Sequence, residues 1–286
     1  MPNIRLIKRR IRGVQSTAKI TRAMEMIATL RMRRAQERGL AGRPYSDKIS
    51  QVLADLAALA RGSEEVPHPL LQSRPVNRIA IVHITPDRGL CGGLNANLNR
   101  LTANFILGQK VPVSLINVGR KGLEFMRRYR RDIRAEFTRL GDQPSLLDTL
   151  PISRIIIDDY GNCLFDQVYL VYARFVSTMV QKPFMKQILP VEPAEIPQAQ
   201  NVDYIYEPGP VAVLGALLPR FVEMQLYHAV LESIASEQSA RMVAMRSATD
   251  NANELIEDLT LMYNKARQES ITRELLDITG GAAALE

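Results

Sequence analysis

The chain has 286 residues and a formal net charge of +7. Hydrophobic residues make up 46% of it, and it contains no tryptophan. These values fit one or two helix-rich globular domains. They exclude a membrane-spanning helix, because no apolar run approaches the length of about eighteen residues that a span needs. The two cysteines, Cys91 and Cys163, lack the spacing of a metal or redox motif, so free thiols are expected.

The charge is unevenly distributed along the chain. Residues 1–43 hold twelve Lys or Arg and two acidic residues, whereas residues 220–279 hold six basic and ten acidic residues. Two helices of opposite sign attract each other, although an exposed ion pair contributes only about 0–1 kcal/mol. The N-terminal excess leaves a cationic surface. That surface suits nucleic acid, a ring of carboxylates on a partner protein, or plain solvation, and charge alone leaves all three open.

The N-terminal stretch predicts a helix with a coiled-coil seam. Residues 14–38 contain no glycine or proline, and apolar or small residues recur at steps of three and four. One stripe consists of Ile4, Ile7, Ile11, Val14, Ala18 and Thr21, and after a shift Ile20, Met24 and Ile27 continue it. The shift predicts a stutter in the seam. Gly39, Gly42 and Pro44 predict that the helix ends there.

The middle of the chain alternates helices and strands. Further helices are expected over residues 45–61, from the glycine-rich turn to 107, 121–131, and 145–160 with an interruption at Pro151. Strands are expected over residues 78–85, 111–118 and 167–173, with weaker ones over 186–191 and 204–206. Residues 62–75 are rich in proline and predict a linker. The alternation predicts a small α/β domain with a largely parallel sheet.

The C-terminal stretch predicts a second long helix. Residues 220–279 lack glycine and proline and are rich in helix-favouring side chains. If the first arm ends near Gly39–Pro44 and the second begins just after Pro219, facing residue numbers in an antiparallel pair sum to roughly 260. Residues 257–286 then have no partner within the chain, and a partner protein must cover their apolar side chains.

The expected fold is therefore of the α/β class, with a long antiparallel coiled coil of N- and C-terminal helices and a central Rossmann-like α/β domain. The expected divisions are residues 1–61 for the first helical arm, 76–207 for the central domain and 208–286 for the second arm.

Motifs of catalysis are absent from the sequence. The turn at residues 86–95 is rich in glycine, but it matches neither the P-loop pattern nor the GxGxxG fingerprint. No GxSxG nucleophile motif is present, and His68, His83 and His228 are not at metal-ligand spacing. No catalytic residue, cofactor or metal is expected.

Four motifs resemble one family. KITRAMEMIA at residues 19–28, with MRRAQ at 32–36, is similar to the N-terminal helix of gamma subunits of F-type ATP synthases. DRGLCGGLN at residues 87–95 is similar to the central-domain motif of that family. SEQSARMVAM at 236–245 and YNKARQESIT at 263–272 are similar to its C-terminal helix. The resemblance covers the whole chain; Thr29 and Leu30 depart from the usual small residues, and the dithiol insertion of chloroplast relatives is missing.

The resemblance implies a central rotor stalk without an active site of its own. In this family the coiled coil passes through a ring of alternating alpha and beta subunits, and the α/β domain contacts the epsilon subunit and the membrane ring of c subunits. Proton-driven rotation then couples to ATP synthesis. A peripheral position on the cytoplasmic side of a bacterial plasma membrane follows.

The resemblance also implies residue roles. Contacts with the ring are implied for Met24, Arg33, Arg34, Arg241, Arg267, Gln268, Thr272 and Glu274. A structural role in the glycine-rich turn is implied for Asp87, Arg88, Gly89, Gly92 and Gly93. A nucleic-acid-binding coiled coil and a nucleotide-using α/β enzyme are the rival interpretations. The first leaves the turn and the C-terminal motif unexplained, and the second lacks a phosphate motif.

Overall fold

The computed structural model describes residues 4–60, 68–191, 206–207 and 209–283. Its contacts divide the chain into two compact units: Met1–Ala28 with Arg241–Glu286, and Thr29–Ala240. Among the described residues, none of the helices has both the length and the apolar character that crossing a membrane requires. The predicted linker before residue 68, the predicted strand at 204–205 and the end of the tail from 284 fall outside the described residues.

The two terminal helices are longer than the sequence predicts. Helix α1 runs from Ile4 to Ala60 and α5 from Pro210 to Ala283, with Pro44 and Pro219 inside them. The predicted stop at residues 39–44 and the predicted start after Pro219 are therefore wrong. A proline inside a helix costs about 3 kcal/mol, whereas each large apolar side chain buried against a neighbour contributes about 1.5–3 kcal/mol. Packing of several such side chains outweighs the local stop signal.

Those side chains belong to the unit formed by residues Thr29–Ala240. On α1 they are Ile49, Leu53 and Leu56, and on α5 they are Leu214, Leu218, Val222 and Leu226, all in one core. Each set repeats at steps of three or four residues, which places it on one face of its helix. Most of the stability of these helix segments thus comes from tertiary contact rather than from propensity.

The same unit holds a five-stranded sheet in the order β3-β2-β1-β4-β5. The strands are β1 (Ile79–Ile84), β2 (Val113–Val118), β3 (Ile133–Phe137), β4 (Gln167–Phe175) and β5 (Gln181–Leu189). The pairs β1–β2, β1–β4 and β2–β3 are parallel, and only the edge pair β4–β5 is antiparallel. This confirms the predicted α/β class with a largely parallel sheet.

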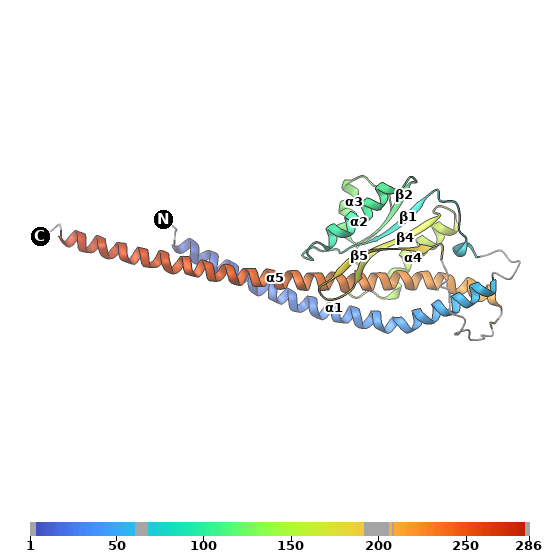
Figure 1. Ribbon diagram of the computed structural model, residues 1–286, viewed down its shortest axis with the longest axis horizontal. Coiled ribbons are helices and arrows are strands. Elements are labelled where there is room, and N and C mark those ends of the chain that lie inside the picture. The colour runs from blue at the N-terminus through green and yellow to red at the C-terminus, as the bar shows by residue number, and fades with distance from the viewer. Residues whose placement is uncertain (1–3, 61–67, 192–205, 208, 284–286) are drawn as a thin grey trace. The chain divides into compact units, whose positions relative to one another are not determined.

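Helices cover both faces of the sheet (Figure 1). Helices α2 (Leu94–Gly108) and α3 (Arg120–Arg128) lie on one face, while α4 (Leu146–Gly161) and the first part of α5 lie on the other. A short 3₁₀ turn, η1 (Pro69–Leu71), precedes the sheet. All six residues of β1 are buried, as expected for a central parallel strand covered on both faces.

The elements of this domain agree with the sequence except at the sheet edges and at Pro151 of α4. Strand β3 is not predicted, although its residues alternate between half-buried and exposed positions, which is the period of a strand with one solvated face. Strand β5 begins five residues before the predicted strand. Tyr206, at the end of the other weak strand, belongs to no strand. Helix α4 continues through Pro151, so the predicted interruption is wrong.

A buried histidine joins β1 to α2. The His83 Nε2 lies 2.9 Å from Asn99 Oδ1, and its Nδ1 lies 2.7 Å from Thr102 Oγ1. Because an amide oxygen only accepts hydrogen bonds, Nε2 carries the proton of a neutral ring. Gly122 of α3 leaves space for this ring, since a Cβ there would lie 2.5 Å from His83 Cδ2. Burial lowers the pKa of His83 to about 4, opposed by the hydrogen bond to Asn99.

This depressed pKa predicts loss of stability in mild acid. Between pH 6.5, the ordinary pKa of histidine, and pH 4, the unfolded chain binds a proton that the folded chain excludes. The free energy of unfolding should therefore decrease as the pH is lowered through that window. Denaturant titrations at pH 7 and pH 5 measure the difference. His83→Gln should lose part of this dependence, while His68→Gln, at a half-buried histidine, should keep most of it. Equal pH dependence in wild type and His83→Gln would contradict this assignment.

Candidate functional site

The unit formed by the start of α1 and the end of α5 is an antiparallel two-helix pair. Thr21 Oγ1 lies 2.7 Å from Thr249 Oγ1, and Arg246 Nε donates to Glu25 Oε1 at 2.9 Å. Buried positions on α5 follow steps of three, four and seven residues: Met242, Met245, Thr249, Ala252, Leu259 and Ala266. Small and apolar residues at heptad spacing are what a coiled-coil seam requires.

The seam on α1 runs without a stutter. Its buried positions Ile7, Ala18, Thr21 and Ala28 fit one heptad pattern, and the exposed fractions of Ile20 and Ile27 are 58% and 49%. The predicted shift onto Ile20 and Ile27 is therefore wrong. Half-buried Glu25 continues the seam instead, because its carboxylate pairs with Arg246 across the interface.

The register of the two helices differs from the predicted sum of about 260. Thr21 faces Thr249, and in the other unit a Cβ at Gly42 would lie 2.6 Å from His228 Cε1; both pairs of residue numbers sum to 270. The prediction took Gly39–Pro44 and Pro219 as helix ends. Because both helices continue through these residues, the ends gave the wrong alignment.

The corrected register shortens the part of α5 that has no helical neighbour. Ile7 and Leu6 share a surface hollow of about 390 Å³ with Leu259, Met262 and Ala266, so α1 covers α5 as far as Ala266. Beyond it Ile271, Leu275, Leu276 and Ile278 are 48–69% exposed. Among the described residues, the uncovered tip of α5 therefore begins near residue 267 and not at 257.

Four of the predicted contact residues lie on this tip. Arg267, Gln268, Thr272 and Glu274 are all exposed, and the Glu274 carboxylate accepts a hydrogen bond from Ser270 Oγ at 3.3 Å. These side chains share the tip with the exposed apolar residues. The combination is typical of a surface that another protein covers.

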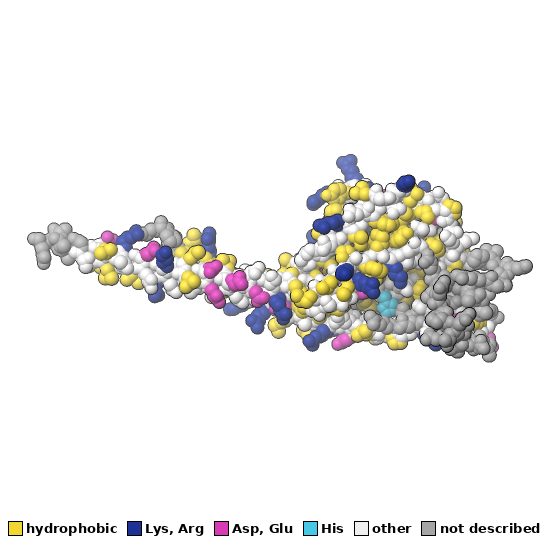
Figure 2. Space-filling model, in the orientation of Figure 1, with side chains coloured by type: hydrophobic (Ala, Val, Ile, Leu, Met, Phe, Trp, Pro, Cys, Tyr) yellow, Lys and Arg dark blue, Asp and Glu magenta, His cyan; other side chains and the backbone are white. Residues whose placement is uncertain are grey.

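The remaining predicted contact residues differ in exposure. Arg33 and Arg34 are exposed on α1, and Met24 is half-buried. Arg241 is only 8% exposed, so this chain itself covers most of its side chain. On the face shown in Figure 2, acidic side chains gather on the two-helix unit between basic ones. The exposed carboxylates of α5 in this unit include Asp250, Glu254, Glu257 and Asp258.

The glycine-rich turn after β1 is held by Asp87. Its Oδ1 accepts from the Arg120 backbone N–H and its Oδ2 from the Arg139 N–H, each at 2.9 Å. Its backbone oxygen also accepts from the Arg120 guanidinium at 3.2–3.3 Å. A helix N-terminus attracts anions, and at α3 the carboxylate of Asp87 fills that position. Gly119 is required beside it, because a Cβ there would lie 1.8 Å from Thr85 O.

Two other residues of the turn have left-handed backbone conformations. Gly92 has φ +58° and Leu90 has φ +63°, which is the left-handed region that glycine adopts without strain. Arg88 is exposed, as is Gly93, which precedes α2. No cluster of metal-ligating side chains occurs among the residues that the structure describes.

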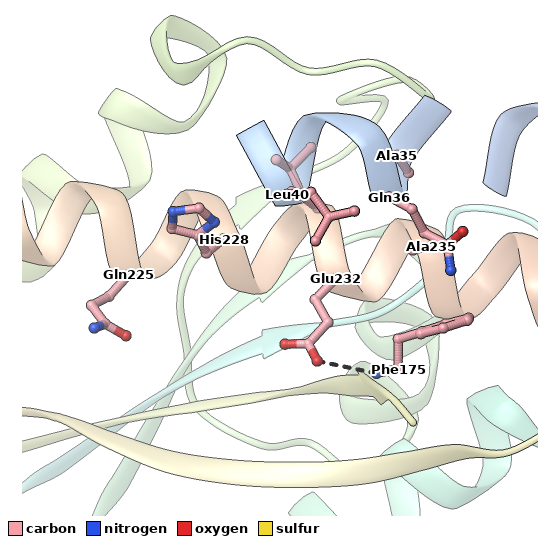
Figure 3. Close-up of a pocket in the computed structure, with 10 residues that line it drawn as sticks. Ala35, Gln36, Leu40, Phe175, Gln225, His228, Glu232 and Ala235 are labelled. Atoms are coloured by element: carbon pink, nitrogen blue, oxygen red, sulfur yellow. Dashed lines mark hydrogen bonds between the residues drawn. The ribbon is translucent and has the colours of Figure 1, made fainter. Parts of the chain in front are cut away.

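A pocket of about 470 Å³ lies between α1, α5 and the end of β4 (Figure 3). Ala35 and Leu40 of α1 and Ala235 of α5 give it apolar walls. Glu232 is the acidic residue lining it, and its Oε1 accepts from the Phe175 N–H at 3.2 Å (Figure 3). Burial raises the pKa of Tyr172, and the nearby Glu232 carboxylate raises it further. Glu232 thus fastens α5 to β4.

Comparison with known proteins identifies relatives over the full chain. A family model described as ATP synthase matches residues 3–285. The ATP synthase gamma chain of Dehalococcoides mccartyi strain CBDB1 is 67% identical over 285 residues, with 100% of both chains covered. That of Roseiflexus castenholzii is 51% identical, with 100% of this chain and 99% of the relative covered.

Solved structures share the fold at lower identity. A chain of the Euglena gracilis mitochondrial ATP synthase matches with a TM-score of 0.67 and 19% identity, covering 99% of this chain and 94% of that one. A chain from the central stalk and c-ring of the Tetrahymena thermophila enzyme matches with a TM-score of 0.63 and 23% identity, covering 80% and 99%.

The corrected register predicts a specific cross-link. In a background with Cys91 and Cys163 replaced by serine, Thr21→Cys with Thr249→Cys should form a disulfide on mild oxidation, because the two hydroxyl oxygens are 2.7 Å apart. The control pair Thr21→Cys with Ile256→Cys should not, since residue 256 lies about 10 Å further along the helix. Non-reducing electrophoresis or mass spectrometry reads the result. A disulfide only in the control pair would overturn the register.

Proposed function

The chain belongs to the ATP synthase gamma-chain family, and on that premise we propose that its paired helices turn inside a ring of alpha and beta subunits. The gamma chain is the non-catalytic subunit of the central stalk of this rotary complex. Its proposed task is to carry rotation of the c-subunit ring to the catalytic sites of the surrounding ring, and so to drive ATP synthesis.

One observation carries this proposal: among the described residues, no helix covers the tip of α5 beyond Ala266. Ile271 and three further apolar side chains there are 48–69% exposed. Each such side chain gains about 1.5–3 kcal/mol when it is fully buried, so the tip favours an enclosing partner. A sleeve formed by the alpha and beta subunits would cover it while allowing it to turn, because apolar contacts are non-directional.

The proposed contacts are of two kinds. On the tip, Arg267, Gln268, Thr272 and Glu274 would form hydrogen bonds with the ring, each worth about 1.5–3 kcal/mol when a charged group takes part. On α1, exposed Arg33 and Arg34 would face acidic loops of the beta subunits. Family resemblance assigns Met24 to the contact with these acidic loops. It assigns Arg241 to the hydrogen-bonding residues of the C-terminal helix, although burial leaves Arg241 little area to offer.

The α/β domain is proposed to contact the epsilon subunit and the c ring. On this division the first arm comprises residues 1–61, the central domain 76–207 and the second arm 208–286. The chain is part of a membrane-associated complex, and we place it on the cytoplasmic side of a bacterial plasma membrane as a peripheral subunit. Asp87 supports a structural role for the glycine-rich turn, since its carboxylate occupies the N-terminus of α3.

The charges of Arg33 and Arg34 provide a test of the proposed contact with the ring. Reversing Arg33 and Arg34 together to Glu should lower assembly with alpha and beta subunits, or coupled turnover, about two- to tenfold, since each exposed pair contributes up to about 1 kcal/mol. The defect should be largest at low salt, because screening acts within about 10 Å at 0.1 M ionic strength. Coupled ATP synthesis in reconstituted vesicles measures it.

A matched control separates the position of the charge from its amount. Arg100→Glu with Arg154→Glu makes the same change at two exposed arginines of the α/β domain. That variant should keep assembly with alpha and beta subunits. Unchanged assembly and turnover of the Arg33 and Arg34 variant at low salt would assign these arginines to a solvated face.

A further inference from the structure

The connection between β3 and α4, residues 138–145, reaches both long helices within the unit Thr29–Ala240. The Asp142 carboxylate lies between them: its Oδ2 is 2.6 Å from Arg31 Nη1 of α1, and its Oδ1 accepts from Gln238 Nε2 of α5 at 3.2 Å. Gln238 is buried, with 1% of its surface exposed. One carboxylate thus bridges the two helices.

Neighbouring residues of the same loop repeat this arrangement. Gln143 Oε1 accepts from Arg38 Nη2 of α1 at 2.8 Å, and Pro144 O accepts from Tyr227 OH of α5 at 3.4 Å. Three consecutive residues, Asp142–Pro144, therefore hold α1 and α5 together from one side. Arg31 and Arg38 are seven residues apart, so they project from the same face of α1.

Both ends of the loop are anchored in the α/β domain. At its start the Arg139 N–H donates to Asp87 Oδ2 at 2.9 Å. At its end the Asp148 carboxylate accepts from the Ser145 N–H at 2.7 Å and caps α4. A force acting on Asp142 is therefore transmitted through these hydrogen bonds to the turn after β1 and to α4.

Helix α5 also has direct hydrogen bonds with β4 and with the turn between β4 and β5. Ser236 Oγ donates to Ala173 O at 2.9 Å, and Ser239 Oγ donates to Thr178 O at 2.6 Å. Helix α1 packs into the same unit through apolar side chains such as Leu53 and Leu56. Apolar contact is non-directional, so it fixes the orientation of a helix less sharply than polar contacts do. Charge-assisted hydrogen bonds have defined geometry and resist sliding.

We propose that the β3–α4 loop is a clasp that makes both helices turn with the α/β domain, with Asp142 as its central positioning residue. The proposal rests on the rotary function proposed above and adds the route by which torque enters α1. The clasp gives rotation of the domain a direct polar route to α1, beside the apolar packing of residues such as Leu53 and Leu56.

The first experiment uses the isolated full chain. Asp142→Ala should speed amide hydrogen exchange over residues 138–144 by about two- to fivefold, because partly exposed contacts of this kind shift an opening equilibrium by such factors. Asp158→Ala, at an exposed aspartate of α4, is the matched control and should leave the loop unchanged. Equal exchange in the two variants would overturn the clasp.

The second experiment uses the assembled complex in vesicles. The Asp142→Ala complex should hydrolyse ATP at close to the wild-type rate but pump fewer protons per ATP, by a factor of about two or more. Arg31→Glu with Asp142→Arg reverses the pair and should restore pumping. Loosened exchange with unchanged pumping would overturn the torque role. Failure of the wild-type chain to assemble with alpha and beta subunits would instead contradict the proposed function. The hydrogen-exchange experiment would still show whether Asp142 holds the loop in place.

Discussion

The structure depends on the register in which α1 lies against α5. Thr21 opposite Thr249 and Gly42 opposite His228 follow one alignment, although these contacts lie in different units. In a heptad seam a slip by one residue would move buried side chains toward solvent, so the small residues Ala18, Ala28 and Ala252 specify the pairing. This alignment also fixes where α1 stops covering α5, and hence which residues form the tip offered to a partner.

The sequence predicts the type of most elements and fails where local signals compete with packing. The parallel strands and the turn at Asp87 follow from short-range patterns and agree with the structure. The stop at Gly42 and Pro44 does not, because glycine at residue 42 permits close approach of α1 to His228 rather than ending the helix. Strand β3 escapes prediction because it is a short edge strand with one solvated face.

The functional surface is predictable only in part. The family motifs point to residues on the α5 tip that the structure leaves exposed, and also to Arg241, which the chain itself buries. The clasp could not be predicted, since Arg31, Asp142 and Gln238 are about a hundred residues apart in sequence and meet only through the fold. None of the three belongs to a pattern with a regular period. Asp87 serves a structural purpose where nucleotide-binding domains would accept phosphate, which agrees with a subunit that transmits motion and carries out no chemistry.

The central claim is that this chain turns inside a stationary ring. Cys163 is an exposed free thiol and Cys91 is buried, so a light-scattering bead can be attached to the α/β domain at Cys163 alone. With the ring of alpha and beta subunits fixed to a surface, ATP should turn the bead continuously in one direction. A bead that stays still while the same complexes hydrolyse ATP at the full rate would contradict the rotary account.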